Sequence, residues 1–164
     1  MISDKGAKQM SQRKLSMVLM LAGGLAVIGV AFLLYIMPAF LLVYGGSPLY
    51  SLTQMALGVP YMAALWHYFR ICKNIGDDRS FCPENARRMD IIAKLLFLAS
   101  GLWALMLIAM LLVRGGAITG YELVSFVEVL LTLMATLAVG LVAKMMALLV
   151  GRASRLQEEN DLTI

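Results

Sequence analysis

The sequence predicts an all-α integral membrane protein, a four-helix bundle that forms a single domain over residues 1–164. Of the 164 residues, 61% are hydrophobic and only 15% are charged, which is more apolar surface than a soluble domain of this size can bury. The uncharged residues form long runs, and the Lys and Arg residues are confined to short clusters between them. Lipid is therefore the expected surrounding of most side chains.

The first two helices are expected around the stretch 15–69, which contains no charged side chain. Such a run is more than twice the ~20 residues that one span needs. The segment Gly45-Gly46-Ser47-Pro48 interrupts it and predicts a turn. We therefore expect a helical hairpin with transmembrane helices at about 15–38 and 50–72. The first run is longer than the roughly 7–15 residues of a signal-peptide core, so we expect an uncleaved helix.

The third and fourth helices follow a charged loop. The third is expected at about 91–113, where an apolar run ends at Arg114 and two glycines. The fourth is expected at about 121–150. At about 1.5 Å per residue a helix of this length reaches about 45 Å, which exceeds the bilayer core. We therefore expect it to tilt or to extend into the cytoplasm with the tail 151–164.

The orientation follows from the Lys and Arg residues. All 14 of them except Arg114 lie in three clusters: at the N-terminus, around the loop 73–90, and at the C-terminal end. Cationic segments stay on the cytoplasmic side of a membrane. Only an even number of spans puts all three clusters on one face, so we expect a multi-pass protein of the bacterial inner membrane with both termini in the cytoplasm. Cys72 and Cys82 are then expected to be free thiols.

The loop 73–90 holds the densest polar sequence of the chain. Pro83 suits the first turn of a helix and Glu84 suits its positive end, so the third helix is expected to start there. On one interpretation the loop is a well-capped turn whose cations face anionic lipid. On the other it docks a cytoplasmic protein, together with the tail 152–164. The candidate contacts are Arg79, Glu84, Asn85, Arg87, Arg88, Glu158, Glu159 and Asp161.

Two stretches of the sequence resemble a known family. One is RSFCPENARRM, from Arg79 to Met89, and the other is the terminal ENDLTI, from Glu159 to Ile164. Together with the layout of the spans, they resemble the bacterial four-helix membrane proteins grouped as domain of unknown function 2975. Members of that family are often encoded beside a small helix-turn-helix DNA-binding protein. The resemblance therefore implies such a transcription factor as a cytoplasmic partner.

A second candidate site lies along the fourth helix, where polar and small residues interrupt the apolar run. At about 100° per residue they fall on one face, which we expect to turn inward. Ionisable groups inside a membrane often mark a path for ions or substrate, and Glu128 is the candidate for that role. Alternatively, Glu122 and Glu128 pair with Arg114 while Lys144 reaches toward the membrane surface. The face comprises Glu122, Ser125, Glu128, Thr132, Thr136, Gly140 and Lys144.

No complete catalytic, metal or cofactor motif is present, so we expect a protein that is not an enzyme and uses no cofactor. His67 is the only histidine, and with the two cysteines it gives neither the usual zinc spacing nor two axial haem ligands. The net charge of +4 is divided among clusters, which does not predict direct binding of nucleic acid.

Three functions are compatible with these features. The first is a membrane-anchored regulator that binds a cytoplasmic protein at the surface described above, where nearly all the hydrophilic sequence lies. The second is a small proton- or ion-coupled transporter that uses Glu128, as a homo-oligomer. The third is an accessory subunit of a larger membrane complex.

Overall fold

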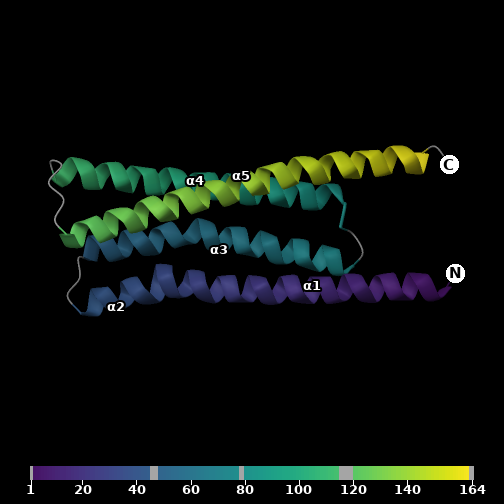
Figure 1. Cartoon of the computed structure of the whole chain (residues 1–164), viewed down its shortest axis with the longest axis horizontal. Coiled ribbons are helices and arrows are strands. Elements are labelled where there is room, and N and C mark those ends of the chain that lie inside the picture. The colour runs from purple at the N-terminus through teal and green to yellow at the C-terminus, as the bar shows by residue number, and fades with distance from the viewer. Residues whose placement is uncertain (1, 45–47, 78–79, 115–119, 163–164) are drawn as a thin grey trace.

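The computed structural model describes residues 2–44, 48–77, 80–114 and 120–162. Its elements are α1 (Ile2–Ala31), a π-helical turn η1 (Phe32–Ile36), α2 (Met37–Val43), α3 (Pro48–Gly76), α4 (Pro83–Arg114) and α5 (Gly120–Leu162). The first three elements follow one another without a break and form one rod, so four long rods lie side by side (Figure 1). The all-α four-helix architecture predicted from the sequence is confirmed.

The π-helical turn has a cause in the sequence. Pro38, near the start of α2, lacks the N–H that would bond to the carbonyl of Leu34, and its ring would clash with that carbonyl in a regular α-helix. The wider turn shifts the hydrogen-bond pattern, so that the N–H of Met37 bonds to the carbonyl of Phe32. The helix thereby continues through the proline to Val43, beyond the predicted end at residue 38.

Helices α1 and α3 pack closely because a glycine leaves room for a ring. A Cβ atom at Gly23 would lie 2.6 Å from Cε1 of Tyr68. The hydroxyl of Tyr68 donates a hydrogen bond of 2.9 Å to the carbonyl of Leu19, which holds the ring over Gly23. A second bond of 2.6 Å runs from Oγ of Ser16 to the carbonyl of Cys72. The interface is thus specified by shape and by hydrogen bonds together.

Helices α4 and α5 meet along small residues. Gly151 of α5 lies beside Ala86 of α4, and Gly140 of α5 faces the same helix. A Cβ atom at Gly140 would lie 3.1 Å from Cε1 of Phe97 and 3.3 Å from Cβ of Leu96. Small side chains at such positions let two backbones approach, which is the usual basis of helix pairing in membranes.

The helices differ in how apolar they are. Three segments of the described residues are long and apolar enough to cross a membrane, by length and composition: Met10–Phe40, Pro83–Leu112 and Ser125–Asn160. Helix α3 is not among them. It carries the polar residues Ser51 and Gln54, which are 0% and 5% exposed. These groups lie inside the bundle, where hydrocarbon would not reach them.

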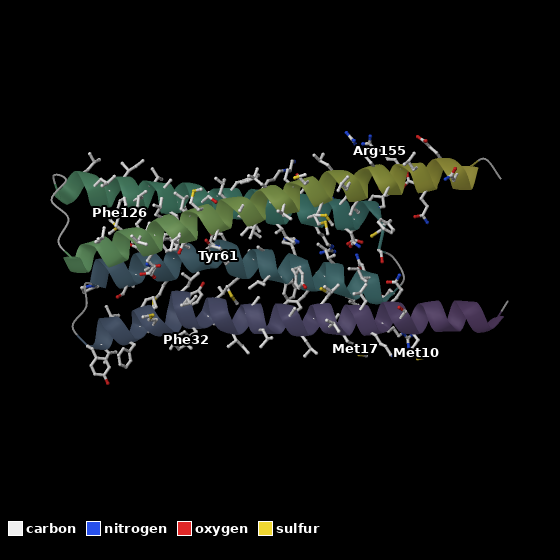
Figure 2. The ribbon with its side chains drawn as sticks, in the orientation of Figure 1. Met10, Met17, Phe32, Tyr61, Phe126 and Arg155 are labelled. Atoms are coloured by element: carbon white, nitrogen blue, oxygen red, sulfur yellow. The ribbon has the colours of Figure 1, made fainter. Side chains whose placement is uncertain are left out.

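Large apolar side chains cover the outside of the bundle. Leu21, Val43 and Leu112 are exposed by 71%, 79% and 77%. In Figure 2, Met17 and Phe32 point away from the other helices. Apolar exposure of this extent is unfavourable in water and suits contact with acyl chains. The described residues thus form the apolar-coated helical bundle of a membrane protein.

Both termini lie at the same end of the bundle (Figure 1). At that end α1 is longer than the sequence predicts, because it begins at Ile2, where a start near 15 was expected. Helix α4 begins at Pro83, where the sequence predicts a helix start, and α5 continues to Leu162, as the expected extension of the fourth helix into the tail requires. The predicted loop 73–90 is therefore largely helical, and the connection between α3 and α4 comprises only residues 77–82.

Candidate functional site

We call the end of the bundle that carries both termini the polar end, and define it as residues 73–90 and 152–164. It is built by the last turn of α3, the first two turns of α4 and the projecting part of α5. Pro83 opens α4 and Glu84 lies in its first turn, as the sequence predicts. Helices α4 and α5 touch here, since a Cβ atom at Gly151 would lie 3.7 Å from that of Ala86. The structure thus brings the loop and the tail together.

The predicted contact residues of the polar end differ in their exposure. Arg87 on α4 and Glu158 and Glu159 on α5 are exposed. Arg79 lies outside the described residues, and so does the side chain of Asp161. A partner at this surface would therefore meet a basic side chain from α4 and acidic side chains from α5.

Glu84 and Arg88 form an ion pair one helical turn apart. The side chain of Arg88 is only 19% exposed, whereas that of Glu84 is 58% exposed. An exposed pair of this kind contributes at most about 1 kcal/mol to stability. Its main effect is to hold the guanidinium group of Arg88 against the bundle, which leaves Arg87 as the more accessible of these two neighbouring arginines.

Asn85 does not lie on the surface, contrary to the prediction that it contacts a partner. It is 1% exposed. Its Oδ1 accepts a hydrogen bond of 2.8 Å from Nδ2 of Asn74, and its own Nδ2 donates one of 3.1 Å to the carbonyl of Ser80. The side chain therefore ties the end of α3 to the start of α4. The sequence could not separate the two roles, because an amide can cap a helix as well as bind a partner.

Substitution of Asn85 by alanine is expected to destabilise the protein by about 2 kcal/mol, because it leaves buried partners of the amide without hydrogen bonds. The free energy of unfolding in a titration with SDS, with the protein in mild detergent, measures the effect. Gln157→Ala is the matched control, since Gln157 is exposed on α5. Equal stability of the two variants would contradict the structural role of Asn85.

A hydrogen-bonded group of three side chains lies inside the bundle. Nε1 of Trp103 donates a hydrogen bond of 2.9 Å to the hydroxyl of Tyr61, and that hydroxyl lies 2.6 Å from Oγ1 of Thr136. Trp103 and Thr136 are buried, with 2% and 6% exposure. The group joins α3, α4 and α5 (Figure 2, which labels Tyr61). Buried polar groups that satisfy one another in this way fix a unique arrangement of helices.

A cavity of about 380 Å³ lies next to this group, between residues of the rod α1–α2 and of α3, α4 and α5. Glu128 and Thr132 line it together with Tyr61, Trp103 and Thr136. Glu128 is exposed and Thr132 is half-buried, with its Oγ1 donating a hydrogen bond of 2.8 Å to the carbonyl of Glu128. The predicted polar face therefore turns inward at Thr136 and opens into a cavity at Glu128.

Lys144 is paired, which neither interpretation of the fourth helix anticipated. Its ammonium group contacts Oδ1 of Asp90, and Oδ2 of the same carboxylate lies 2.8 Å from Nζ of Lys94. The pair links α4 to α5 near the polar end. The proposed pairing of Glu122 or Glu128 with Arg114 lies outside the described residues, because the side chains of Glu122 and Arg114 are not among them.

The titratable and thiol side chains of the described part of the chain do not gather into a metal site. No three His, Cys, Asp or Glu side chains come together there as a metal site needs. Cys72 and Cys82 are free, the first buried and the second half-buried.

Helical periodicity predicted that Thr136 and Lys144 face other helices, but it did not identify their partners. These partners are Tyr61 and Asp90, which lie 75 and 54 positions away along the chain.

The chain matches a known protein family over nearly all of its residues. A family model described as "Protein of unknown function (DUF2975)" matches residues 3–164. No curated protein and no solved structure matches the chain. The matched range includes both stretches that carry the family resemblance, RSFCPENARRM and ENDLTI. This chain therefore belongs to the DUF2975 family.

Proposed function

We propose that this chain is a multi-pass protein of the bacterial inner membrane and a non-enzymatic regulator that holds a soluble cytoplasmic protein at its polar end. All four rods would cross the bilayer, α3 included, because α3 runs beside α1 and α4 along their length (Figure 1). The distribution of Lys and Arg favours the cytoplasm as the side of the polar end.

The projection of α5 carries this proposal. Gly151 lies beside Ala86, and α4 begins only three residues from that point, at Pro83. Beyond this level α5 continues to Leu162 for about 12 Å without α4 at its side. Glu158 and Glu159 are exposed on this stretch. A helix that projects from an apolar bundle and carries exposed charges is a suitable docking element for a soluble protein.

The partner that we propose is a small helix-turn-helix transcription factor, as the family resemblance implies. Its binding would sequester the factor at the membrane or report a membrane signal to it. The exposed Arg87 on one side and Glu158 and Glu159 on the other favour a partner surface with charges of both signs. Such charges control the rate and specificity of association more than its strength.

Affinity capture tests the proposal. The full-length protein in mild detergent should retain a soluble DNA-binding protein, identified by mass spectrometry, and the variant Arg87→Ala/Glu158→Ala/Glu159→Ala should lose it. Arg13→Ala/Lys14→Ala is the control, because both residues are exposed on α1 at the same end. Equal retention by all three proteins, or no DNA-binding protein at all, would refute the proposed role.

The orientation can be tested with Cys82, which is half-buried in the short connection between α3 and α4. In intact cells a membrane-impermeant maleimide is expected to leave Cys82 unlabelled, and to label it once the inner membrane is opened. Cys72 is 1% exposed and should react with neither treatment. Labelling of Cys82 in intact cells would place the polar end outside and remove the cytoplasmic partner.

A second candidate function is proton- or ion-coupled transport. The observation in its favour is that Glu128 lines the cavity of about 380 Å³ next to Tyr61 and Trp103. Purified protein in liposomes should then carry a proton-coupled flux that the substitution Glu128→Gln abolishes. A flux that survives this substitution would exclude the mechanism.

The third possibility is an accessory subunit of a larger membrane complex. Purification in mild detergent tests it, because the other membrane proteins of the complex would then copurify with this chain in stoichiometric amounts.

A further inference from the structure

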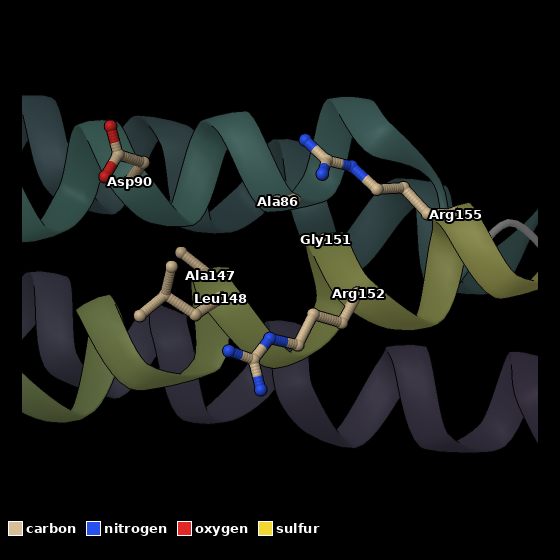
Figure 3. A pocket seen from close by; sticks show the side chains of 7 residues that line it. All are labelled: Ala86, Asp90, Ala147, Leu148, Gly151, Arg152 and Arg155. Carbon is tan, nitrogen blue, oxygen red and sulfur yellow. The ribbon is translucent and has the colours of Figure 1, made fainter.

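A cleft of about 320 Å³ lies between α4 and α5 at the level where the polar end begins (Figure 3). Small residues form its floor: Ala86 from α4, and Ala147 and Gly151 from α5. Arg152 and Arg155 also line it; in Figure 3 both side chains run back along α5, that of Arg155 on the side where α4 lies and that of Arg152 on the other side. We call it the arginine cleft. Its volume leaves room for a ligand the size of a phosphate group between the two arginine side chains.

The charge around the arginine cleft is positive. Arg152 and Arg155 are both exposed. The carboxylate of Asp90 is already held by Lys144 and Lys94. Arg152 and Arg155 add two positive charges beside a carboxylate that two lysines already neutralise, and this surplus attracts an anion. Guanidinium groups suit phosphate in particular, because their planar donors form paired hydrogen bonds with its oxygens.

An apolar stripe on α5 leads away from the arginine cleft. Leu141, Met145 and Leu148 follow one another at helical spacing on the face that also carries Arg152. They are exposed by 52%, 64% and 56%, and Leu148 lines the cleft itself. The predicted span ends at residue 150, so Arg152 lies where lipid headgroups would be. A free phosphate ion would gain nothing from the stripe, whereas an acyl chain would lie along it.

We propose that the arginine cleft binds the phosphate group of an anionic phospholipid, with an acyl chain along Leu141, Met145 and Leu148. The lipid would bridge α4 and α5 at the base of the projecting helix. Its binding does not depend on the proposed regulatory partner, because Arg152 and Arg155 are not among the proposed contacts of that partner, Arg87, Glu158 and Glu159.

Native mass spectrometry of the full-length protein in mild detergent tests this site. Phosphatidylglycerol is expected to bind at least about tenfold more tightly than phosphatidylcholine, which has no net charge. The variant Arg152→Gln/Arg155→Gln should weaken the binding of phosphatidylglycerol by about 30-fold, from the usual contribution of two cations at a membrane surface. Gly151→Leu keeps both arginines but fills the floor of the cleft, and should weaken binding as well.

Arg13→Gln/Lys14→Gln is the matched control, because it removes the same charge from exposed positions on α1 at the same end. It should change the affinity by less than about twofold, since a distant charge is screened. Equal losses in the two double variants, or full binding by Gly151→Leu, would overturn the site. Displacement of the lipid by millimolar inorganic phosphate would show a site for free phosphate and overturn the lipid assignment.

If Arg152→Gln/Arg155→Gln aggregates during purification, Arg152→Lys/Arg155→Lys replaces it. Unchanged affinity of this lysine variant for phosphatidylglycerol would contradict paired guanidinium binding.

Discussion

Replacement of Trp103 by alanine is expected to destabilise the bundle by about 3–5 kcal/mol. Trp103 is 2% exposed and packs in the core with Leu57 and Val129. Its loss opens a cavity where three helices meet and removes the donor that bonds to Tyr61. The reactivity of the buried Cys72 thiol during SDS titration, in a Cys82→Ser background, reports the unfolding.

Trp66→Ala is the control for this experiment, because it removes the same side chain from an exposed position. Trp66 is 61% exposed, and its ring contacts the guanidinium group of Arg70 at 5.3 Å. The expected loss there is at most about 1 kcal/mol. If the two tryptophan variants unfolded at the same SDS concentration, the core around Trp103 would not be the one that the structure shows.

Leucine at position 23 is expected to destabilise the α1–α3 interface by about 3 kcal/mol, through overpacking. A Cβ atom there would already lie 2.6 Å from Tyr68 and 3.1 Å from Cε1 of Phe69. The ring of Tyr68 cannot move aside without losing its hydrogen bond to the carbonyl of Leu19. The same SDS titration measures the effect.

Gly29→Leu makes the same change on the same helix at an exposed position, where a Cβ atom would meet nothing within 4 Å. It should leave stability within about 0.5 kcal/mol of the wild type. A wild-type midpoint for Gly23→Leu, or an equal loss for Gly29→Leu, would show that α1 does not pack on α3 through Gly23.

The sequence is sufficient to predict the four long helices, because hydrophobic runs and glycine-rich interruptions determine them. It is less informative about their ends. Polar residues before residue 15 form helix without being apolar, so hydropathy could not detect this extension, whereas the length of the fourth run did indicate the extension beyond residue 150. The π-helical turn was not predicted. Pro38 cannot donate the hydrogen bond of a regular α-helix, but a proline alone does not determine whether the helix ends, kinks or forms a wider turn at that point.

The site was predicted only in part, for a related reason. The periodicity of the fourth helix indicated that Thr136 and Lys144 face other helices, and they do. Their partners depend on which residues of α3 and α4 reach the same height, and a single sequence does not determine that register. Asn85 shows the opposite error. Its polarity suggested a surface position, but a short connection between two helices needed the amide inside.

The packing order of the rods has a consequence for how the protein is made. Among the described residues, close backbone approach between rods joins only neighbours in the chain: α1 and α2 with α3, α3 with α4, and α4 with α5. Each rod can therefore pack against the rod that precedes it in the chain before the following rods have been synthesised. Contacts that are local in sequence favour rapid folding, and domains generally acquire structure from the N-terminus during synthesis. A nascent chain that ends after α3 is therefore expected to have packed the rod α1–α2 against α3. Helices α4 and α5 would then add to this hairpin as a second one.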